Sequence, residues 1–112
     1  MAEVLLRLSR YGAVETLYVS GELDLASAPV LERTVAGALD GQWGEFRLDL
    51  SGVTFMDSSG SKALMRVHNQ VEAFGRHLVV LSPAPVVQSV LEVLGLNRVM
   101  DVRPAPDGVR AS

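Results

Sequence analysis

The chain contains no cysteine, so it forms no disulfide bond, carries no thiolate nucleophile and offers no cysteine ligand to a metal. Basic residues are few: 10 Lys and Arg stand against 13 Asp and Glu, and this net charge of −3 argues against a nucleic-acid or anionic-membrane surface. The N-terminus lacks a signal-type sequence, and no apolar run approaches the roughly 20 residues that cross a bilayer. We therefore expect a cytoplasmic protein with no nucleic-acid or membrane partner, no cofactor and no metal.

Length and composition predict one folded domain. At 112 residues, 48% of them hydrophobic, the chain can bury a core without disulfides or metals. No repeat, linker or low-complexity segment divides the chain, so we assign residues 1–112 to a single domain. The proline-containing stretch from Arg103 to Gly108 predicts a loose C-terminal tail over residues 104–112.

Hydrophobic periodicity divides the chain into strands and helices. Period-two alternation indicates strands, apolar spacings of three and four indicate helices, and Ser, Pro and Gly mark helix ends. The expected elements are strands over 4–9 and 16–20, a helix from the N-cap Ser27 with Pro29 in its first turn to before Gly41, a strand over 46–50, a helix from Asp57 or Ser58 to Gly75, a strand over 78–81, a helix from Ser82-Pro83 to Gly95, and a strand over 99–102.

This order, ββαβαβα(β), predicts an α/β fold. The first two strands form an antiparallel hairpin around Tyr11-Gly12-Ala13. The later strand–helix–strand units require right-handed crossovers and a partly parallel sheet. We expect an open mixed sheet of four to five strands with helices mainly on one face. Within it, the third strand ends at Ser51-Gly52, and Phe74 shares the apolar face of the second helix with Leu64 and Val67.

The segment Asp57-Ser58-Ser59-Gly60 follows a strand and opens a helix. Free backbone N–H groups at a helix N-terminus favour anions, including a phosphate, and Ser58 places a hydroxyl there. The alternative is purely structural, because Asp, Ser and Gly at a helix start are usually caps.

A second polar segment, Gly21-Glu22-Leu23-Asp24, ends the second strand. It leaves the sheet at the same carboxyl edge as the segment that contains Ser58, so Asp24 and Ser58 could face one another there. The alternative is a turn with solvated carboxylates.

Other candidate residues are weaker. His68 lies ten helical residues after Ser58, about 15 Å along the helix axis, which is too far for the base of a serine hydrolase. His77 starts a parallel strand and belongs at the opposite edge of the sheet. Trp43 is expected in a loop at the sheet edge.

These motifs resemble a known family. Gly21 to Asp24, Leu48-Asp49-Leu50 and Val53 to Gly60 are similar to the anti-sigma-factor antagonists, bacterial single-domain members of the STAS group (sulfate transporters and anti-sigma antagonists). The similarity extends over roughly residues 4 to 103. It implies a STAS fold and a binding protein that is not an enzyme.

The resemblance also implies a mechanism. In the family, the serine directly after the aspartate of Asp-Ser-Ser-Gly is phosphorylated by a serine kinase that is itself the anti-sigma factor, and the matching residue is Ser58. The unphosphorylated form binds this kinase and frees a sigma factor, phosphorylation switches binding off, and a protein phosphatase is a further partner. The family's two conserved acids match Asp24 and Asp57.

One departure concerns the partner surface. The family commonly continues with a small or aliphatic pair such as Leu-Gly, where this chain has Ser61-Lys62. A Lys in the first turn opposes the helix dipole, but it could offset a phosphate on Ser58. Ser59 and Ser61 are rival phosphoacceptors. The residues expected at the kinase interface are Asp24, Asp57, Ser59, Gly60, Ser61 and Lys62. The alternative function is a STAS scaffold or ligand-binding module of a stress-signalling complex.

Overall fold

The computed structural model describes residues 3–39 and 44–105. Its elements are β1 (Val4–Tyr11), β2 (Val14–Leu23), α1 (Ala28–Ala38), β3 (Glu45–Met56), α2 (Ser58–Ala73), β4 (His77–Leu81), α3 (Pro85–Leu94), the short 3₁₀ helix η1 (Leu96–Arg98) and β5 (Asp101–Arg103). The order matches the predicted ββαβαβα(β). Pro104 and Ala105 have no regular structure, whereas the rest of the predicted tail, and Trp43, lie outside the described residues.

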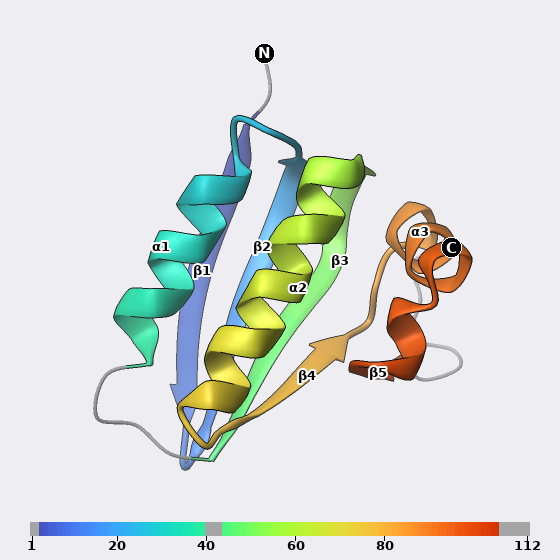
Figure 1. Ribbon diagram of the computed structural model, residues 1–112. Coiled ribbons are helices and arrows are strands. Elements are labelled where there is room, and N and C mark those ends of the chain that lie inside the picture. Colours follow the sequence, from blue (N-terminus) through green and yellow to red (C-terminus); the bar gives the residue numbers. More distant parts are fainter. Residues whose placement is uncertain (1–2, 40–43, 106–112) are drawn as a thin grey trace.

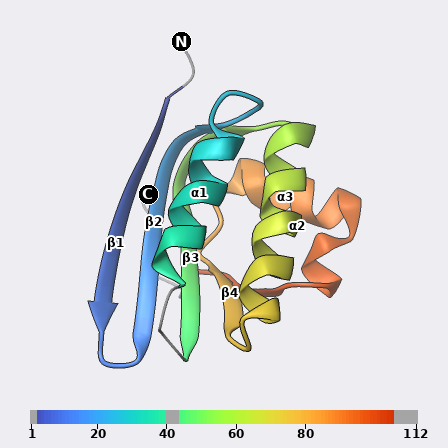
Figure 2. The same ribbon diagram turned by 60° about the vertical axis from the view of Figure 1, so that its left-hand side comes forward.

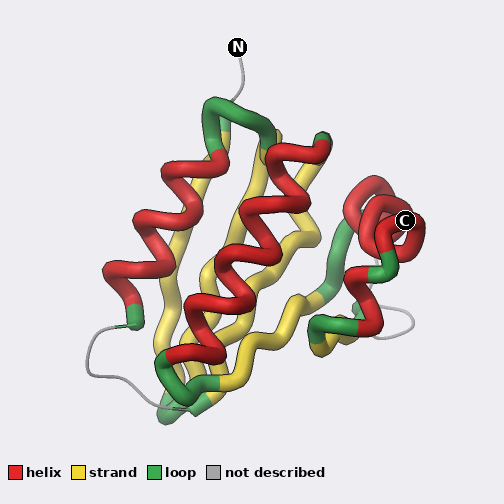
Figure 3. The backbone as a smooth tube through the Cα atoms, viewed as in Figure 1, coloured by secondary structure: helices red, strands yellow, loops and turns green. Residues whose placement is uncertain are grey.

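The strands form one five-stranded sheet in the order β1-β2-β3-β4-β5. Strands β1 and β2 pair antiparallel, and the other neighbours pair parallel, so the sheet is mixed as predicted. Helices α1 and α2 lie side by side on one face of the sheet (Figures 1 and 2). Helix α3 lies on the far side of α2 from α1 and packs on β3 (Figure 3).

The core lies between the sheet and the helices. Leu17, Leu48 and Val80 occupy one row across β2, β3 and β4, and all three are fully buried. They share one cluster of buried residues with Leu31 of α1 and Leu64 of α2. The same face of α2 was expected to include Phe74, but Phe74 is the C-cap and 58% exposed, because the helix ends there beyond the edge of the core.

Strand β3 corrects one prediction. Ser51-Gly52 was expected to end this strand, but the strand continues to Met56. A Cβ atom on Gly52 would lie 2.7 Å from the Cβ of Ser20, so the glycine allows β2 and β3 to approach closely where their register shifts. Gly52 therefore serves the pairing of the two strands, and Met56 leads directly into α2.

The start of α3 corrects a second prediction. Ser82-Pro83 was expected to open this helix, but α3 begins at Pro85 with Ala84 as its N-cap. The N–H of Ser82 donates instead to the carbonyl of Arg103 at 2.8 Å, and Ser82 adopts a left-handed φ of 51°. The connection is thus held by hydrogen bonds to the sheet before the helix begins. Within the described residues, no helix is long and apolar enough to cross a membrane.

Candidate functional site

The ends of β2 and β3 bring the two polar segments together. Leu23 pairs with Met56 as the last residue of each strand, and the N–H of Asp57 donates to the carbonyl of Leu23 at 3.3 Å. Asp24 comes directly after Leu23, and Ser58 comes directly after Asp57. The two segments that were predicted to share an edge are therefore hydrogen-bonded neighbours.

Asp57 is the N-cap of α2. Its Oδ1 accepts hydrogen bonds from the backbone N–H groups of Ser59 at 2.9 Å and Gly60 at 3.1 Å. The helix start was expected to offer free N–H groups to an anion, and this expectation is wrong for these two donors, because a carboxylate of the chain itself already occupies them. The alternative interpretation of this segment, as a cap of the helix, is therefore confirmed for Asp57.

Asp24 organises the turn between β2 and α1. Its Oδ1 accepts from the N–H groups of Ala26 and Ser27, both at 3.1 Å. Ser27 occupies the N-cap position of α1 as predicted, but its side chain makes no capping bond to the helix. The buried Ser27 hydroxyl instead donates to the carbonyl of Glu22 at 2.6 Å, because the turn folds back over it.

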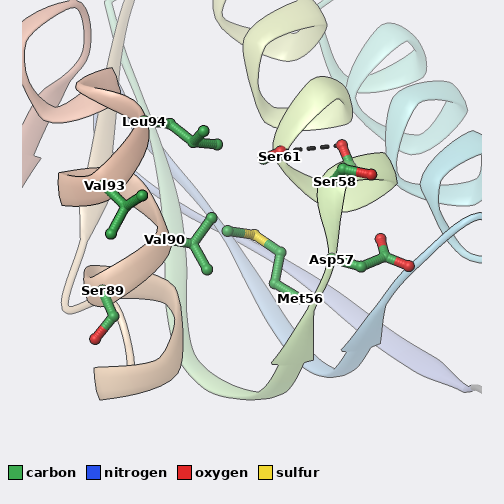
Figure 4. A pocket seen from close by; sticks show the side chains of 8 residues that line it. All are labelled: Met56, Asp57, Ser58, Ser61, Ser89, Val90, Val93 and Leu94. Carbon is green, nitrogen blue, oxygen red and sulfur yellow. Dashed lines mark hydrogen bonds between the residues drawn. The ribbon is translucent and has the colours of Figure 1, made fainter.

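The three serines near the start of α2 differ in their access to solvent. Ser58 is exposed, Ser59 is half-buried and Ser61 is only 4% exposed. The Ser61 hydroxyl donates to the carbonyl of Ser58 at 2.9 Å, as Figure 4 shows. Of these three serines, Ser58 is the most exposed to solvent. Lys62 is exposed one turn further along α2.

Gly60 fixes how closely α2 approaches the end of β2. A Cβ atom at this position would lie 2.4 Å from the carbonyl oxygen of Leu23 and 2.7 Å from Cγ of Met56. Both distances are too short for a side chain, so the first turn of α2 can sit against the strand end only if residue 60 is glycine. This close packing sets the position of Ser58.

An apolar groove of about 340 Å³ lies beside Ser58, between the start of α2 and α3. Figure 4 shows Met56 at its floor, with Ser58 on one wall and Val90, Val93 and Leu94 on the other. Sequence reasoning missed this groove, because the apolar spacing of α3 does not show whether another element covers Val90 and Leu94. Leu94 is in fact 54% exposed and Val93 is 84% exposed.

The histidines lie away from this edge. His77 Nε2 is 2.7 Å from Asp101 Oδ2, and Nδ1 is 3.4 Å from a carboxylate oxygen of Glu72. The hydrogen bond to Asp101 raises the pKa of His77 above its usual value. His68 Nε2 lies 4.0 Å from Glu72 near the other end of α2 from Ser58. Residues 3–39 and 44–105 also hold no cluster of side chains suited to a metal ion.

Comparisons with known proteins agree with this architecture. The family model described as "Mlab, STAS domain" matches residues 6–103. The anti-sigma-B factor antagonist of Bacillus subtilis (strain 168) is 27% identical over 90 residues, covering 80% of this chain and 82% of that protein. An anti-sigma factor antagonist from Mycobacterium paratuberculosis has a TM-score of 0.81 at 24% identity, over 94% of this chain and 89% of that one. The antagonist SpoIIAA in its unphosphorylated form has a TM-score of 0.75 at 22% identity, over 92% and 90%.

The five-stranded mixed sheet, with its helices and the polar segments at the ends of β2 and β3, is the architecture of a STAS domain. The chain belongs to the STAS domain family, and the relatives named above are anti-sigma factor antagonists.

Proposed function

We propose that this protein is a phosphorylation-controlled antagonist, which binds an anti-sigma factor with serine kinase activity and loses that binding when Ser58 is phosphorylated. The observation that carries the proposal is the exposed Ser58 hydroxyl at the first position of α2, on the wall of an apolar groove. Binding of the anti-sigma factor would free a sigma factor in the cytoplasm, and a protein phosphatase would restore the active form. SpoIIAA, which has a similar fold, has been solved in unphosphorylated and phosphorylated forms, and this supports phosphorylation as the control of the present chain.

The modification is a transfer from ATP held by the kinase. The Ser58 oxygen attacks the γ-phosphorus, the bond from that phosphorus to the bridging oxygen of ADP breaks, and ADP leaves with its electron pair. The hydroxyl proton passes to a base of the kinase. The chain therefore needs to supply only an accessible hydroxyl, and of the serines at this helix start Ser58 fits best by exposure.

Electrostatics explain how the phosphate would prevent binding. A phosphoserine carries about −1.5 to −2 charges at neutral pH. On Ser58 it would join the carboxylates of Asp57 and Asp24 at one edge and stand beside the apolar groove. An unmatched charge buried in an interface costs about 2–5 kcal/mol, which weakens binding roughly 30- to 4,000-fold. No change of fold is needed.

Site mapping tests the proposal directly. The protein is incubated with its cognate anti-sigma factor and ATP, and phosphate is located by mass spectrometry. We expect modification of Ser58 in the wild type and none in Ser58→Ala, which should still bind the partner. Ser89→Ala is the matched control, because Ser89 is an exposed serine on the opposite wall of the same groove. Stoichiometric phosphate on Ser59 or Ser61 would contradict the assignment.

A charged mimic tests whether charge is the cause. Ser58→Asp supplies about one negative charge where phosphate supplies nearly two, so it should weaken binding less than phosphorylation does. Its circular dichroism spectrum should match the wild type, because an acid at a helix start is tolerated. Wild-type affinity of Ser58→Asp in low salt would show that charge does not drive the switch.

Two substitutions of Asp24 separate its structural part from a part in partner binding. Asp24→Asn keeps an Oδ1 acceptor for the N–H groups of Ala26 and Ser27, whereas Asp24→Ala removes it. We expect only Asp24→Ala to lower the melting temperature, and both to reduce affinity for the anti-sigma factor. Loss of a hydrogen bond to a charged group costs about 1.5–3 kcal/mol, or roughly 10- to 150-fold in affinity. Unchanged affinity in Asp24→Asn would leave Asp24 a purely structural residue.

A further inference from the structure

We propose that Lys62 is a positioning residue that holds the phosphate group of phosphorylated Ser58 in an ion pair across one turn of α2. This inference rests on the proposed function, since it describes what happens once Ser58 carries a phosphate. The two residues stand at positions i and i+4 of the same helix, a spacing that places their side chains on one face with Cβ atoms about 5–6 Å apart. Both are exposed, so neither must leave the core to meet.

The backbone at the helix start leaves little for the phosphate to bind. The N–H groups of Ser59 and Gly60 donate to Asp57 Oδ1, and the N–H of Ser61 donates to the carbonyl of Asp57 at 3.0 Å. A phosphate on Ser58 would have to displace the Asp57 carboxylate to take these donors. The phosphate is therefore directed outward, toward side chains on the surface of α2.

Lys62 is the cation available on that surface. The chain has one lysine, and within residues 3–39 and 44–105 Lys62 takes part in no ion pair. The next cation along α2, Arg66, is already held by both carboxylate oxygens of Glu32 in α1, at 3.0 and 2.9 Å. Because this paired arginine is one turn further away, Lys62 is the residue that can reach the phosphate without breaking an existing interaction.

Carboxylates around Ser58 oppose the second ionisation of a phosphate there, so the positive charge of Lys62 affects that ionisation. Asp57 precedes Ser58, and Asp24 and Glu22 lie in the neighbouring segment at the same edge. These carboxylates repel a phosphate dianion and raise the pKa of its second ionisation, whereas a lysine ammonium lowers that pKa. An exposed i,i+4 ion pair corresponds to a pKa change of about 0.3. Lys62 would thus help the phosphate keep its second charge near neutral pH.

The experiment uses the full chain with phosphoserine installed at position 58 by genetic encoding, so that no kinase is needed. Phosphorus NMR follows the phosphoserine signal through a pH titration in the wild type, Lys62→Met, Lys62→Arg and the control Arg66→Met. We expect Lys62→Met to raise the phosphoserine pKa by about 0.3, and Lys62→Arg to restore the wild-type value. Arg66→Met should leave the pKa unchanged, and about 1 M salt should abolish the difference.

Equal phosphoserine pKa values in the wild type and Lys62→Met at low salt would overturn the inference. An equal rise in Arg66→Met would also overturn it, because the effect would then belong to the helix surface in general. Neither result bears on the proposed function, which fails instead if the anti-sigma factor does not phosphorylate Ser58.

Discussion

Replacing Gly60 with alanine should destabilise the protein, although alanine is the better helix former. Gly60 lies in the first turn of α2, where an added Cβ would meet the carbonyl oxygen of Leu23 at 2.4 Å. That oxygen belongs to a strand backbone and cannot rotate away, and it already accepts the N–H of Asp57. The helix start would have to move away from β2, and the Ser58 hydroxyl would move with it.

The magnitude follows from two opposing effects. Overpacking a rigid contact costs about 1–3 kcal/mol, and alanine in place of glycine in a helix returns at most about 0.5–1 kcal/mol. The difference between these two ranges is about 0–2.5 kcal/mol, so we expect the free energy of unfolding of Gly60→Ala to fall by about 1 kcal/mol, which lowers the melting temperature by about 4–8 °C in a domain of this size. The rate of phosphorylation by the cognate kinase should fall as well.

Gly37→Ala is the matched control. Gly37 lies within α1, and a Cβ atom there would meet nothing within 4 Å. This variant should gain about 0.5–1 kcal/mol and be phosphorylated at the wild-type rate. Urea unfolding and thermal denaturation measure both variants. A Gly60→Ala protein as stable as Gly37→Ala would refute the argument that close packing requires glycine at position 60.

Four further substitutions, two of them in one buried ion pair, probe other features by urea unfolding. Ser82→Gly should raise the free energy of unfolding by up to about 1 kcal/mol, because it relieves the left-handed φ of 51°; a loss would refute this. Arg76→Met should cost less than the roughly 3–5 kcal/mol of a fully unpaired buried charge, because Arg76 Nη1 lies 2.7 Å from Glu15 Oε1 in a buried ion pair, but Glu15 Oε2 keeps its second partner, Arg10. Adding Glu15→Leu should recover much of that loss, and no recovery would contradict the pairing. The hydrogen bond to Asp101 raises the pKa of His77 in the folded protein. The resulting stabilisation is complete below the unfolded pKa of 6.5 and is lost as the pH rises through the folded pKa. His77→Gln should therefore lower the free energy of unfolding at about pH 5.5 but not at about pH 9.

The order of the elements was predictable because each one must bury an apolar face. Period-two alternation predicted β2 and β3, whose Leu17 and Leu48 lie in one buried row, and the spacing of Leu64 and Val67 predicted the buried face of α2. Asp57 at the head of α2 was predictable for a different reason, since an aspartate before a helical pattern can satisfy its first N–H groups.

The features that the sequence did not predict depend on contacts between distant segments of the chain. Gly52 resembles a strand end in the local sequence, and its closeness to Ser20 arises only when β2 and β3 pair. The groove beside Ser58 was missed because periodicity shows which face of α3 is apolar but not whether another element covers it. The chain covers Leu91 fully and leaves Leu94 half-exposed on the same helix.

The residues of the site fall into two groups, which decides how variants should be interpreted. Asp24, Asp57 and Gly60 build the strand ends as well as lining the site, through hydrogen bonds and close packing. Ser58 and Lys62 are exposed, and within the part of the chain that the structure describes their side chains make no hydrogen bond or ion pair. We expect substitutions that remove a hydrogen-bond acceptor of Asp24 or Asp57, or that add a side chain at Gly60, to lower stability, whereas substitutions of Ser58 and Lys62 should leave stability unchanged. A loss of partner binding at wild-type stability, seen with Ser58→Asp and with Asp24→Asn but not explained by unfolding, is therefore the result that separates a switch from a structural motif.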